Sequence, residues 1–409
     1  MPKVHIGERT RITCGREETY SYPWTVTAWK EFPFTPGETL KNSISSFTQN
    51  TIFGDRMVHD IATGSHSPGG SIPFEFMSRG QLTAMQYLLG GASDITAHST
   101  DANAKVRVLY GSIDEASFPS AEAGYQVGGL TFRKWFLTEN TSSDESANPD
   151  SFMIEYTGSK INSFNLSIPQ DGYVTGSIDV LATREAVHDY YPGEGTSWDT
   201  GYLLSSGTEI NSPTGDYVSS FTSPDSDRAI TSVRLANDGG FSGYVQFGDV
   251  GSAAAIATVQ SADFTISNNA ERVQVVGQTE SYSIEMGRRI ISGNMTVVLD
   301  GLDFYNYFLN ETDKELHLKF DARRTGATNE YIEFVFPRIR VGGDGAEAPT
   351  PMVTGSGPLS LTVPFQALRY DSLITTSVES IAIPEYTDVY VIVMLDGGSS
   401  AVADSEFYF

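Results

Sequence analysis

The chain is poor in cysteine and in long apolar runs. Cys14 is the only cysteine among 409 residues, so no disulfide can form within the chain and a structural zinc site is not expected. The longest apolar run, Val389 to Leu395, falls far short of the roughly 18–20 residues that cross a bilayer and fits a buried strand. Residues Met1 to Ile6 contain no apolar signal core. These absences predict a soluble protein that is made in the cytoplasm and does not enter a membrane.

Positive charge is also scarce. The chain has 26 Lys and Arg residues against 51 Asp and Glu residues, which gives a formal net charge of −25. A surface this acidic repels nucleic acids and acidic membranes, which argues against a sequence-reading DNA-binding protein. The same charge is compatible with a protein that lets DNA pass without retaining it, and it also favours solubility.

Motifs for catalysis, metal binding and cofactor binding are missing. The six histidines form no metal-binding pair at helical spacing, and there is no Gly-x-Ser-x-Gly elbow or phosphate-binding loop. Asp225-Ser226-Asp227 lacks the other ligands of a calcium loop. We therefore predict no catalytic residue, no cofactor and no metal site.

What the sequence does contain points to β structure. It has 39 Gly, and its Thr, Ser, Val, Ile, Tyr and Phe residues fall in short alternating runs. An apolar content of 39% with 11% aromatic residues is sufficient for globular cores. The fold class that we predict is mainly β.

One strand–helix unit occurs twice. The first copy has an alternating strand at Gly70–Phe76 and a helix at Gln81–Gly90, and the second has them at Gly293–Leu299 and Leu302–Asn310. Ser78 and Asp300 are expected to cap the two helices at their N-termini, and Gly90 and Asn310 to end them. A duplicated unit predicts a building block with repeated contacts.

The order of the flanking segments also repeats. Leu82 and Leu302 lie 220 positions apart, whereas Ile72 and Met295 lie 223 apart, so the copies differ by a small deletion. Further strands are predicted at 105–110, 130–137, 152–156, 161–168, 173–181, 258–266, 315–320, 331–339 and 359–368. The predicted organisation is an N-terminal arm (1–38), a first β domain (39–189), a linker or inserted module (190–254), a second β domain (255–372) and a C-terminal extension (373–409).

The second half carries a recognisable succession of segments: Gly287–Gly293, Tyr305–Thr312, Phe336–Ile339, Ser356–Leu359 and Val363–Leu368. This succession resembles the tail tube proteins of long-tailed (siphovirus-like) bacteriophages that carry two tube domains in one chain. Segments 55–57, 70–72, 161–163 and 172–177 are similar to that family's first domain. The resemblance covers roughly residues 40–185 and 255–370, and it departs from the family pattern at 190–255 and beyond about residue 375.

The resemblance implies two tandem β-sandwich or barrel domains, each with one flanking helix. It implies a structural virion protein without enzymatic activity. Three chains would supply six domains to a ring, and stacked rings would form a hollow tail tube that conducts phage DNA to the host. Its partners would be other copies of itself, the tail terminator, tip and tape-measure proteins, and DNA that passes through without specific binding.

Two long loops precede the strand–helix units and mix apolar and charged residues, as interface loops do. We expect 50–60 and 269–285 to make contacts between rings, and deletion of either loop to abolish tube assembly while leaving a folded protein. The candidate contact residues are Phe53, Arg56, Met57, Val276 and Tyr282.

Two acidic residues are candidates for the lumen. Glu75 and Asp179 lie on predicted strands opposite the apolar face, and carboxylates in a lumen would repel phosphates. The sequence fits equally a placement of this face on the outside of the tube. The stretch Tyr386–Leu395 is strongly β-prone and would aggregate as a free edge, so we expect it to pair internally or with a neighbouring subunit.

Two other readings are compatible with the sequence. A secreted or virion-attached carbohydrate-binding β protein would use aromatic residues such as Trp24, Trp29, Trp135 and Trp198 as a platform. A glycan-cleaving enzyme would use a pair of carboxylates, for which 51 acidic residues offer many combinations.

Overall fold

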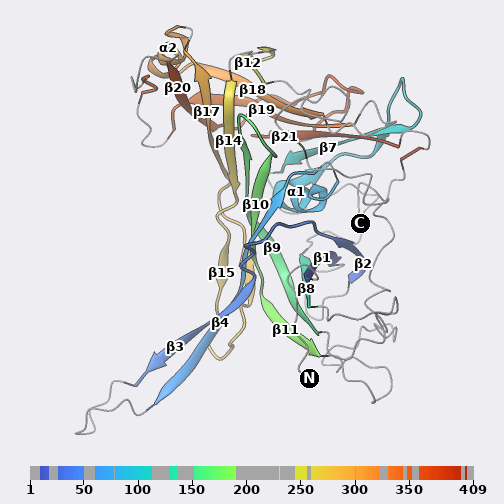
Figure 1. Cartoon of the computed structure of the whole chain (residues 1–409), viewed down its shortest axis with the longest axis vertical. Helices are drawn as coiled ribbons and strands as arrows, with labels where there is room; N and C mark the ends of the chain where they lie inside the picture. The colour runs from blue at the N-terminus through green and yellow to red at the C-terminus, as the bar shows by residue number, and fades with distance from the viewer. Residues whose placement is uncertain are drawn as a thin grey trace.

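The computed structural model describes residues 10–17, 26–49, 60–77, 79–112, 129–136, 152–189, 230, 245–255, 259–299, 301–321, 330–343, 348–351, 359–397 and 401–402 (Figure 1). The strands are β1 (Thr10–Glu17), β2 (Val26–Glu31), β3 (Lys41–Thr48), β4 (Ile61–Glu75), β5 (Gly90–Ala92), β6 (Thr96–Ala97), β7 (Ala104–Gly111), β8 (Leu130–Phe136), β9 (Phe152–Ile168), β10 (Thr175–Leu181), β11 (Arg184–Asp189), β12 (Val245–Asp249), β13 (Ser252–Ala255), β14 (Val259–Ser267), β15 (Glu271–Val273), β16 (Ser283–Glu285), β17 (Ile290–Val298), β18 (Asp313–Asp321), β19 (Tyr331–Val341), β20 (Ser360–Ala367) and β21 (Tyr390–Asp396). Below, the first half is β1–β11 with α1, and the second half is β12–β20 with α2. The predicted mainly β fold is confirmed.

Both predicted helices are present, one in each half: α1 (Leu82–Leu89) and α2 (Asp303–Leu309). Gly90 ends α1 in the left-handed conformation, with φ of 83°, as glycine allows without strain. The prediction for the N-termini is wrong, because Gln81 and Leu302 hold the capping positions and neither side chain caps the helix. Ser78 and Asp300 lie outside the described residues.

One antiparallel sheet runs through both halves in the order β4–β10–β9–β14–β17–β20. Alternation along each strand turns apolar residues such as Phe74, Phe164 and Phe264 to the inner face, where they are buried. Small polar residues occupy the opposite face. We call this six-stranded assembly the central sheet.

A second sheet, β12–β18–β19–β21–β7, packs on the inner face of the central sheet. Figure 1 shows β14 and β17 running vertically while β19, β21 and β7 run nearly horizontally, so the two layers cross at a steep angle. Aromatic rings fill the space between them. Phe264 lies 5.1 Å from Phe334 and 5.4 Å from Phe336 between ring centroids, and Phe76 lies 5.5 Å from Phe320.

A third set of strands, β2–β1–β8–β9–β11, covers the first half. The long strand β9 joins it to the central sheet, because residues 152–159 pair with β8 and residues 160–167 pair with β10. The predicted pair of strands at 152–156 and 161–168 is therefore one continuous strand. Trp135 on β8 is buried, and its indole nitrogen donates to Thr13 Oγ1 at 3.0 Å.

The C-terminal strand β21 lies between the halves. It pairs with β19 of the second half along one edge and with β7 of the first half along the other. All seven of its residues are buried. The expectation that this β-prone stretch pairs internally is confirmed, and the pairing joins the two halves in a second place besides the central sheet.

Candidate assembly interface

The central sheet passes from one half to the other between β9 and β14. Six residue pairs join the two strands, from Ala262 opposite Ile168 to Ser267 opposite Ser163. Phe164 and Phe264 approach each other on the buried face, with ring centroids 6.4 Å apart. An edge of the first half thus pairs directly with a different edge of the second half, which is the geometry of a head-to-tail contact between related units.

Two side chains of the second half complete this junction at the end of α1. Asn268 donates from Nδ2 to the carbonyl oxygens of Leu88, at 2.9 Å, and Ile161, at 3.3 Å. Arg289 donates to the carbonyl oxygen of Leu89 and is held by an ion pair with Asp388 at 2.9 Å. A cationic side chain at a helix C-terminus is favoured by the helix dipole. The second half therefore satisfies the last turn of the first half's helix.

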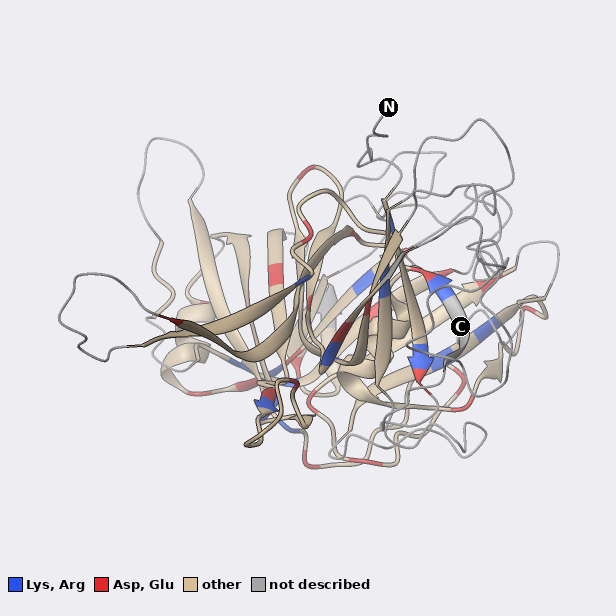
Figure 2. Cartoon of the chain, turned by 90° about the horizontal axis from the view of Figure 1, so that it is seen from below, with Lys and Arg blue, Asp and Glu red and all other residues tan. Residues whose placement is uncertain are grey.

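The outward face of the central sheet is polar, and Lys160, buried opposite Leu181 at the end of β10, is the one Lys or Arg on it at the described positions. One row across the six strands is formed by Glu75, Thr175, Ser167, Asp263, Asn294 and Pro364. Asp179 lies on the same face and accepts a hydrogen bond from Asn162 Nδ2 at 2.9 Å. Figure 2 shows strands at the far left that are tan with a few acidic segments, while blue segments gather near the centre and on the right. This face presents neutral and negative groups.

The structure thus places the sequence candidates Glu75 and Asp179 on one surface and adds Asp263, which sequence reasoning missed. The alternating pattern around Asp263, with Ala262 and Phe264 buried, carried the same signal as that around Glu75.

Two arms extend from the central sheet. The first arm is β3 with residues 61–69 of β4, and it projects far from the body at the lower left of Figure 1. It has no core of its own on either face, and its Ile44, Phe47 and Ile61 side chains are exposed. Sequence reasoning did not select these residues as contact candidates, because Ile44 and Phe47 stand among serines and a threonine in an otherwise polar stretch. Such a concentration of exposed apolar residues marks an interaction surface.

The second arm is residues 269–289, which include the hairpin β15–β16. It packs against the base of the first arm, where the Arg272 guanidinium donates to the carbonyl oxygen of Pro68 and the His66 backbone N–H donates to the carbonyl of Thr279. Val276 and Tyr282, which the sequence analysis selected, project from this arm and are exposed. Phe53, Arg56 and Met57 lie outside the described residues.

A pocket of about 500 Å³ lies between the C-terminal end of α2 and the ends of β19 and β20. Phe308, Leu309, Val341 and Leu368 supply its apolar lining. Among the lining residues, Gly342 has a φ of +105°, which favours glycine, and a Cβ added at this position would lie only 3.0 Å from the Phe308 ring.

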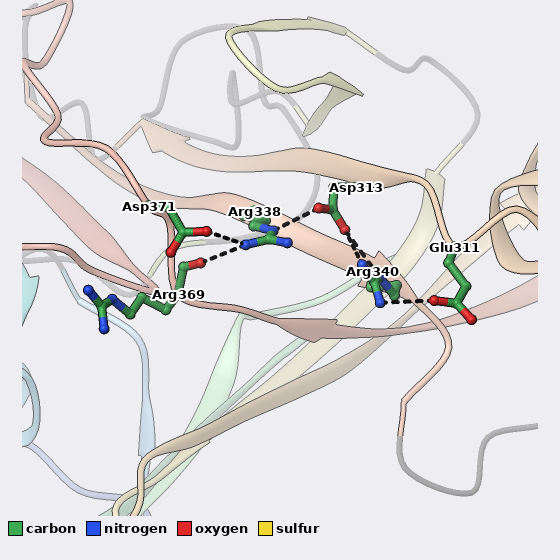
Figure 3. A network of polar contacts seen from close by, with 6 residues as sticks. All are labelled: Glu311, Asp313, Arg338, Arg340, Arg369 and Asp371. Atoms are coloured by element: carbon green, nitrogen blue, oxygen red, sulfur yellow. Dashed lines mark hydrogen bonds and ion pairs between the residues drawn. The ribbon is translucent and has the colours of Figure 1, made fainter.

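An ion-pair network borders this pocket (Figure 3). Arg340 binds Asp313 at 2.9 Å and Glu311 at 3.2 Å. Arg338 binds the same Asp313 at 2.8 Å and Asp371 at 3.0 Å. Burial alone would raise the pKa of Asp313, but the hydrogen bonds from Arg340 and Arg338 hold it below its usual value. The network fixes the ends of β18 and β19 beside the pocket.

A second charged cluster lies on the outer face of β18 and β19. His317 is held between Glu333, 2.8 Å from Nδ1, and Glu315, 2.9 Å from Nε2. Burial alone would lower the pKa of His317, but its hydrogen bonds to these two carboxylates raise it from 6.5 to about 9. The folded chain therefore holds an imidazolium here at neutral pH.

We predict that this cluster makes the folded chain less stable as the pH becomes alkaline. Because the folded pKa lies above the unfolded one, the stabilisation is complete below about pH 6.5 and is lost as the pH rises through about 9. The expected contribution is roughly 1–3 kcal/mol. Thermal unfolding between pH 6 and pH 10 should show a melting temperature that falls over this window in the wild type and falls less in His317→Gln. Parallel curves for the two proteins would contradict the prediction.

Other kinds of site find little support in the described residues. They contain no group of three or more His, Cys, Asp or Glu that could hold a metal ion, and no helix among them is long and apolar enough to cross a membrane. Of the four tryptophans of the suggested carbohydrate platform, Trp135 is buried. Trp24 and Trp198 lie outside the described residues, and the Trp29 side chain is not described.

These features define a class of protein: a β-rich structural subunit whose halves meet edge to edge and whose exposed apolar groups gather on projecting arms. The model of the phage tail tube protein family matches residues 7–367, which is most of the chain. The chain belongs to the phage tail tube protein family and is a structural component of a phage tail. No curated protein is similar enough to be counted as a relative.

Proposed function

We propose that three copies of this chain form a ring of six β units and that the rings stack into a hollow tube that conducts phage DNA to the host. In this arrangement the first and second halves alternate around the ring. The edge of each second half at the end of β19 meets the first arm, formed by β3 and β4, of the next copy. The tube would end on the tail terminator and tip proteins and would enclose the tape-measure protein before DNA passes.

The pairing of β9 with β14 is the observation that carries this proposal. It joins two unlike edges, so the same contact can be repeated from the second half of one chain to the first half of the next. In the second half β19 corresponds to β9, because Val341 pairs with Phe365 of β20 as Ile161 pairs with Val180 of β10, and we assign the repeated contact to this end of β19. A repeated head-to-tail contact closes into a ring when its rotation divides a full turn.

The outward face of the central sheet would line the lumen. Its carboxylates Glu75, Asp179 and Asp263 would repel phosphates, its Ser, Thr and Asn side chains are neutral, and its Lys160 is buried. This composition suits a conduit for DNA rather than a binding site.

The second arm and the segment that connects β3 to β4 would make the contacts between successive rings, whereas β3 itself would face the next copy within the ring. Val276 and Tyr282 project from the second arm, and the first arm extends beyond the body of the chain. Phe53, Arg56 and Met57 belong to the segment that connects β3 and β4, so we assign them to the same contact.

Negative-stain electron microscopy of the purified chain tests the proposal. We expect hollow stacked rings with wild-type protein and separate rings or unassembled chains with Val276→Asp/Tyr282→Asp, because two charges replace exposed apolar contacts. Leu373→Asp, which changes an equally exposed residue outside both arms, is the matched control and should assemble normally.

Two outcomes would count against the proposal. A monodisperse monomer that binds or degrades glycans would favour the carbohydrate-binding alternative. Tubes of unchanged length from the double variant would remove the arms from the ring-to-ring contact, provided that its circular dichroism matches that of wild type.

A further inference from the structure

The duplication lets each position of one half be matched to a position of the other. Strands β4 and β17 correspond with an offset of 223, which places His66 opposite Arg289 in the alignment. Lys41 pairs with Gly69 in the first half as Thr265 pairs with Ser292 in the second, so β3 and β14 correspond with an offset of 224. Ile44 therefore corresponds to Asn268. The register agrees, since Ile44 and His66 are opposite each other on the first arm.

In the first half, the space at the end of the helix is filled. Asn268 and Arg289 of the second half reach the carbonyl oxygens of Leu88 and Leu89, and Asn268 also reaches that of Ile161. Leu88, Leu89 and Ile161 are all buried. Within one chain, this is how the second half contacts the end of the first half's helix, and the proposed ring repeats the contact between neighbouring chains.

In the second half, the matching space is the pocket at the end of α2. Phe308 and Leu309 correspond to Leu88 and Leu89. Val341 corresponds to Ile161 because Val341 pairs with Phe365 of β20 and Ile161 pairs with Val180 of β10, and these two partners lie opposite the matching residues Gly293 and Gly70. Leu309 is 58% exposed, whereas its counterpart Leu89 is buried. The second half thus has the pocket that matches the α1 site, but no described side chain of the same chain corresponds to Asn268 and occupies it.

We propose that this pocket receives Ile44 from the first arm of the next copy in the ring, with His66 of the same arm behind it. Ile44 is 51% exposed on the isolated chain and has no core of its own to join. At the α1 site the polar Asn268 binds backbone carbonyl oxygens. The α2 pocket is lined by Phe308, Leu309 and Leu368, and the apolar Ile44 suits it for that reason. The partner is therefore a second copy of this chain, and the inference rests on the ring of the proposed function.

Cysteine cross-linking tests this docking. The natural Cys14 is buried and will not compete. We expect Ile44→Cys/Leu309→Cys protein, assembled and then treated with an oxidant or a short bismaleimide, to give covalent dimers and trimers on a non-reducing gel. The ladder should stop at trimers, because the contact lies within a ring of three. Neither single variant should give a ladder.

The matched control is Ile44→Cys/Leu302→Cys. Leu302 is equally exposed but lies at the other end of α2, too far for a disulfide, which needs Cα atoms roughly 4.4–6.8 Å apart. Assembled tubes without a cross-link in Ile44→Cys/Leu309→Cys would overturn the docking while leaving the tube. A ladder that continues past trimers would also overturn it, by placing the contact between rings. Protein that forms no rings under any condition would overturn the proposed function itself.

Discussion

Phe264→Ala should lower the free energy of unfolding by about 3–5 kcal/mol. The ring of Phe264 is buried where the central sheet crosses from one half to the other, and it contacts Phe334 and Phe336 of the second layer and Phe164 of the first half. Truncation would leave a cavity bordered by rings that cannot close it without moving two sheets.

Urea denaturation measures this loss as a lower midpoint at unchanged slope. Phe47→Ala is the control, because Phe47 is exposed on the first arm and its truncation should change the unfolding free energy by less than about 0.5 kcal/mol. If the unfolding curve of Phe264→Ala shows two transitions with only one displaced, the halves unfold independently and the junction is weaker than its packing indicates.

Arg79→Met should be similarly costly, at about 3–5 kcal/mol. Arg79 precedes α1 and binds Glu330 at the start of β19 through Nε and Nη2, at 3.3 and 3.2 Å. The two side chains are only 6% and 0% exposed. Nη2 also donates to the backbone carbonyl of Asp396 on β21 at 3.4 Å. Removing the cation leaves the Glu330 carboxylate buried without its principal counter-ion.

The double variant Arg79→Met/Glu330→Met separates the cost of leaving a buried charge unpaired from the cost of losing the ion pair itself. It should recover part of the loss, because neither charge then remains buried. Thermal unfolding of wild type, both single variants and the double variant gives the coupling energy. A double variant less stable than the sum of the single changes would show that the pair itself, and not the orphaned charge, accounts for the effect.

Local pattern predicted most of the elements. Alternation identified β7, β8, β10, β14, β17, β18, β19 and β20 closely and the second half of β4, and the switch to helical period located both helices. The hairpin β15–β16 was predicted as a loop. Gly90 could be predicted to end α1 because the left-handed conformation suits glycine. The N-terminal caps were predicted wrongly because Gln81 and Leu302 hold the capping positions, and neither side chain makes a capping hydrogen bond.

The partners of the strands could not be predicted in this way. Periodicity shows that one face of β9 and of β14 is buried, but it does not indicate which strand pairs with which. The first arm was not predicted as an interaction surface for a related reason, since β3 has exposed residues on both faces and thus no burial alternation to indicate its role. The pocket at α2 depends on segments far apart in the sequence, and only the duplication hints at its counterpart at α1.

The position of β21 has a consequence for the order of folding. Tyr390 pairs with Tyr110, so a strand made late in synthesis must insert between β7, made early, and β19. Contacts of such high sequence separation form slowly, and until they form β7 keeps an unpaired edge. A nascent chain therefore cannot present its finished second sheet before residues 390–396 are available. Completion of that sheet is a late step that depends on the synthesis of β21.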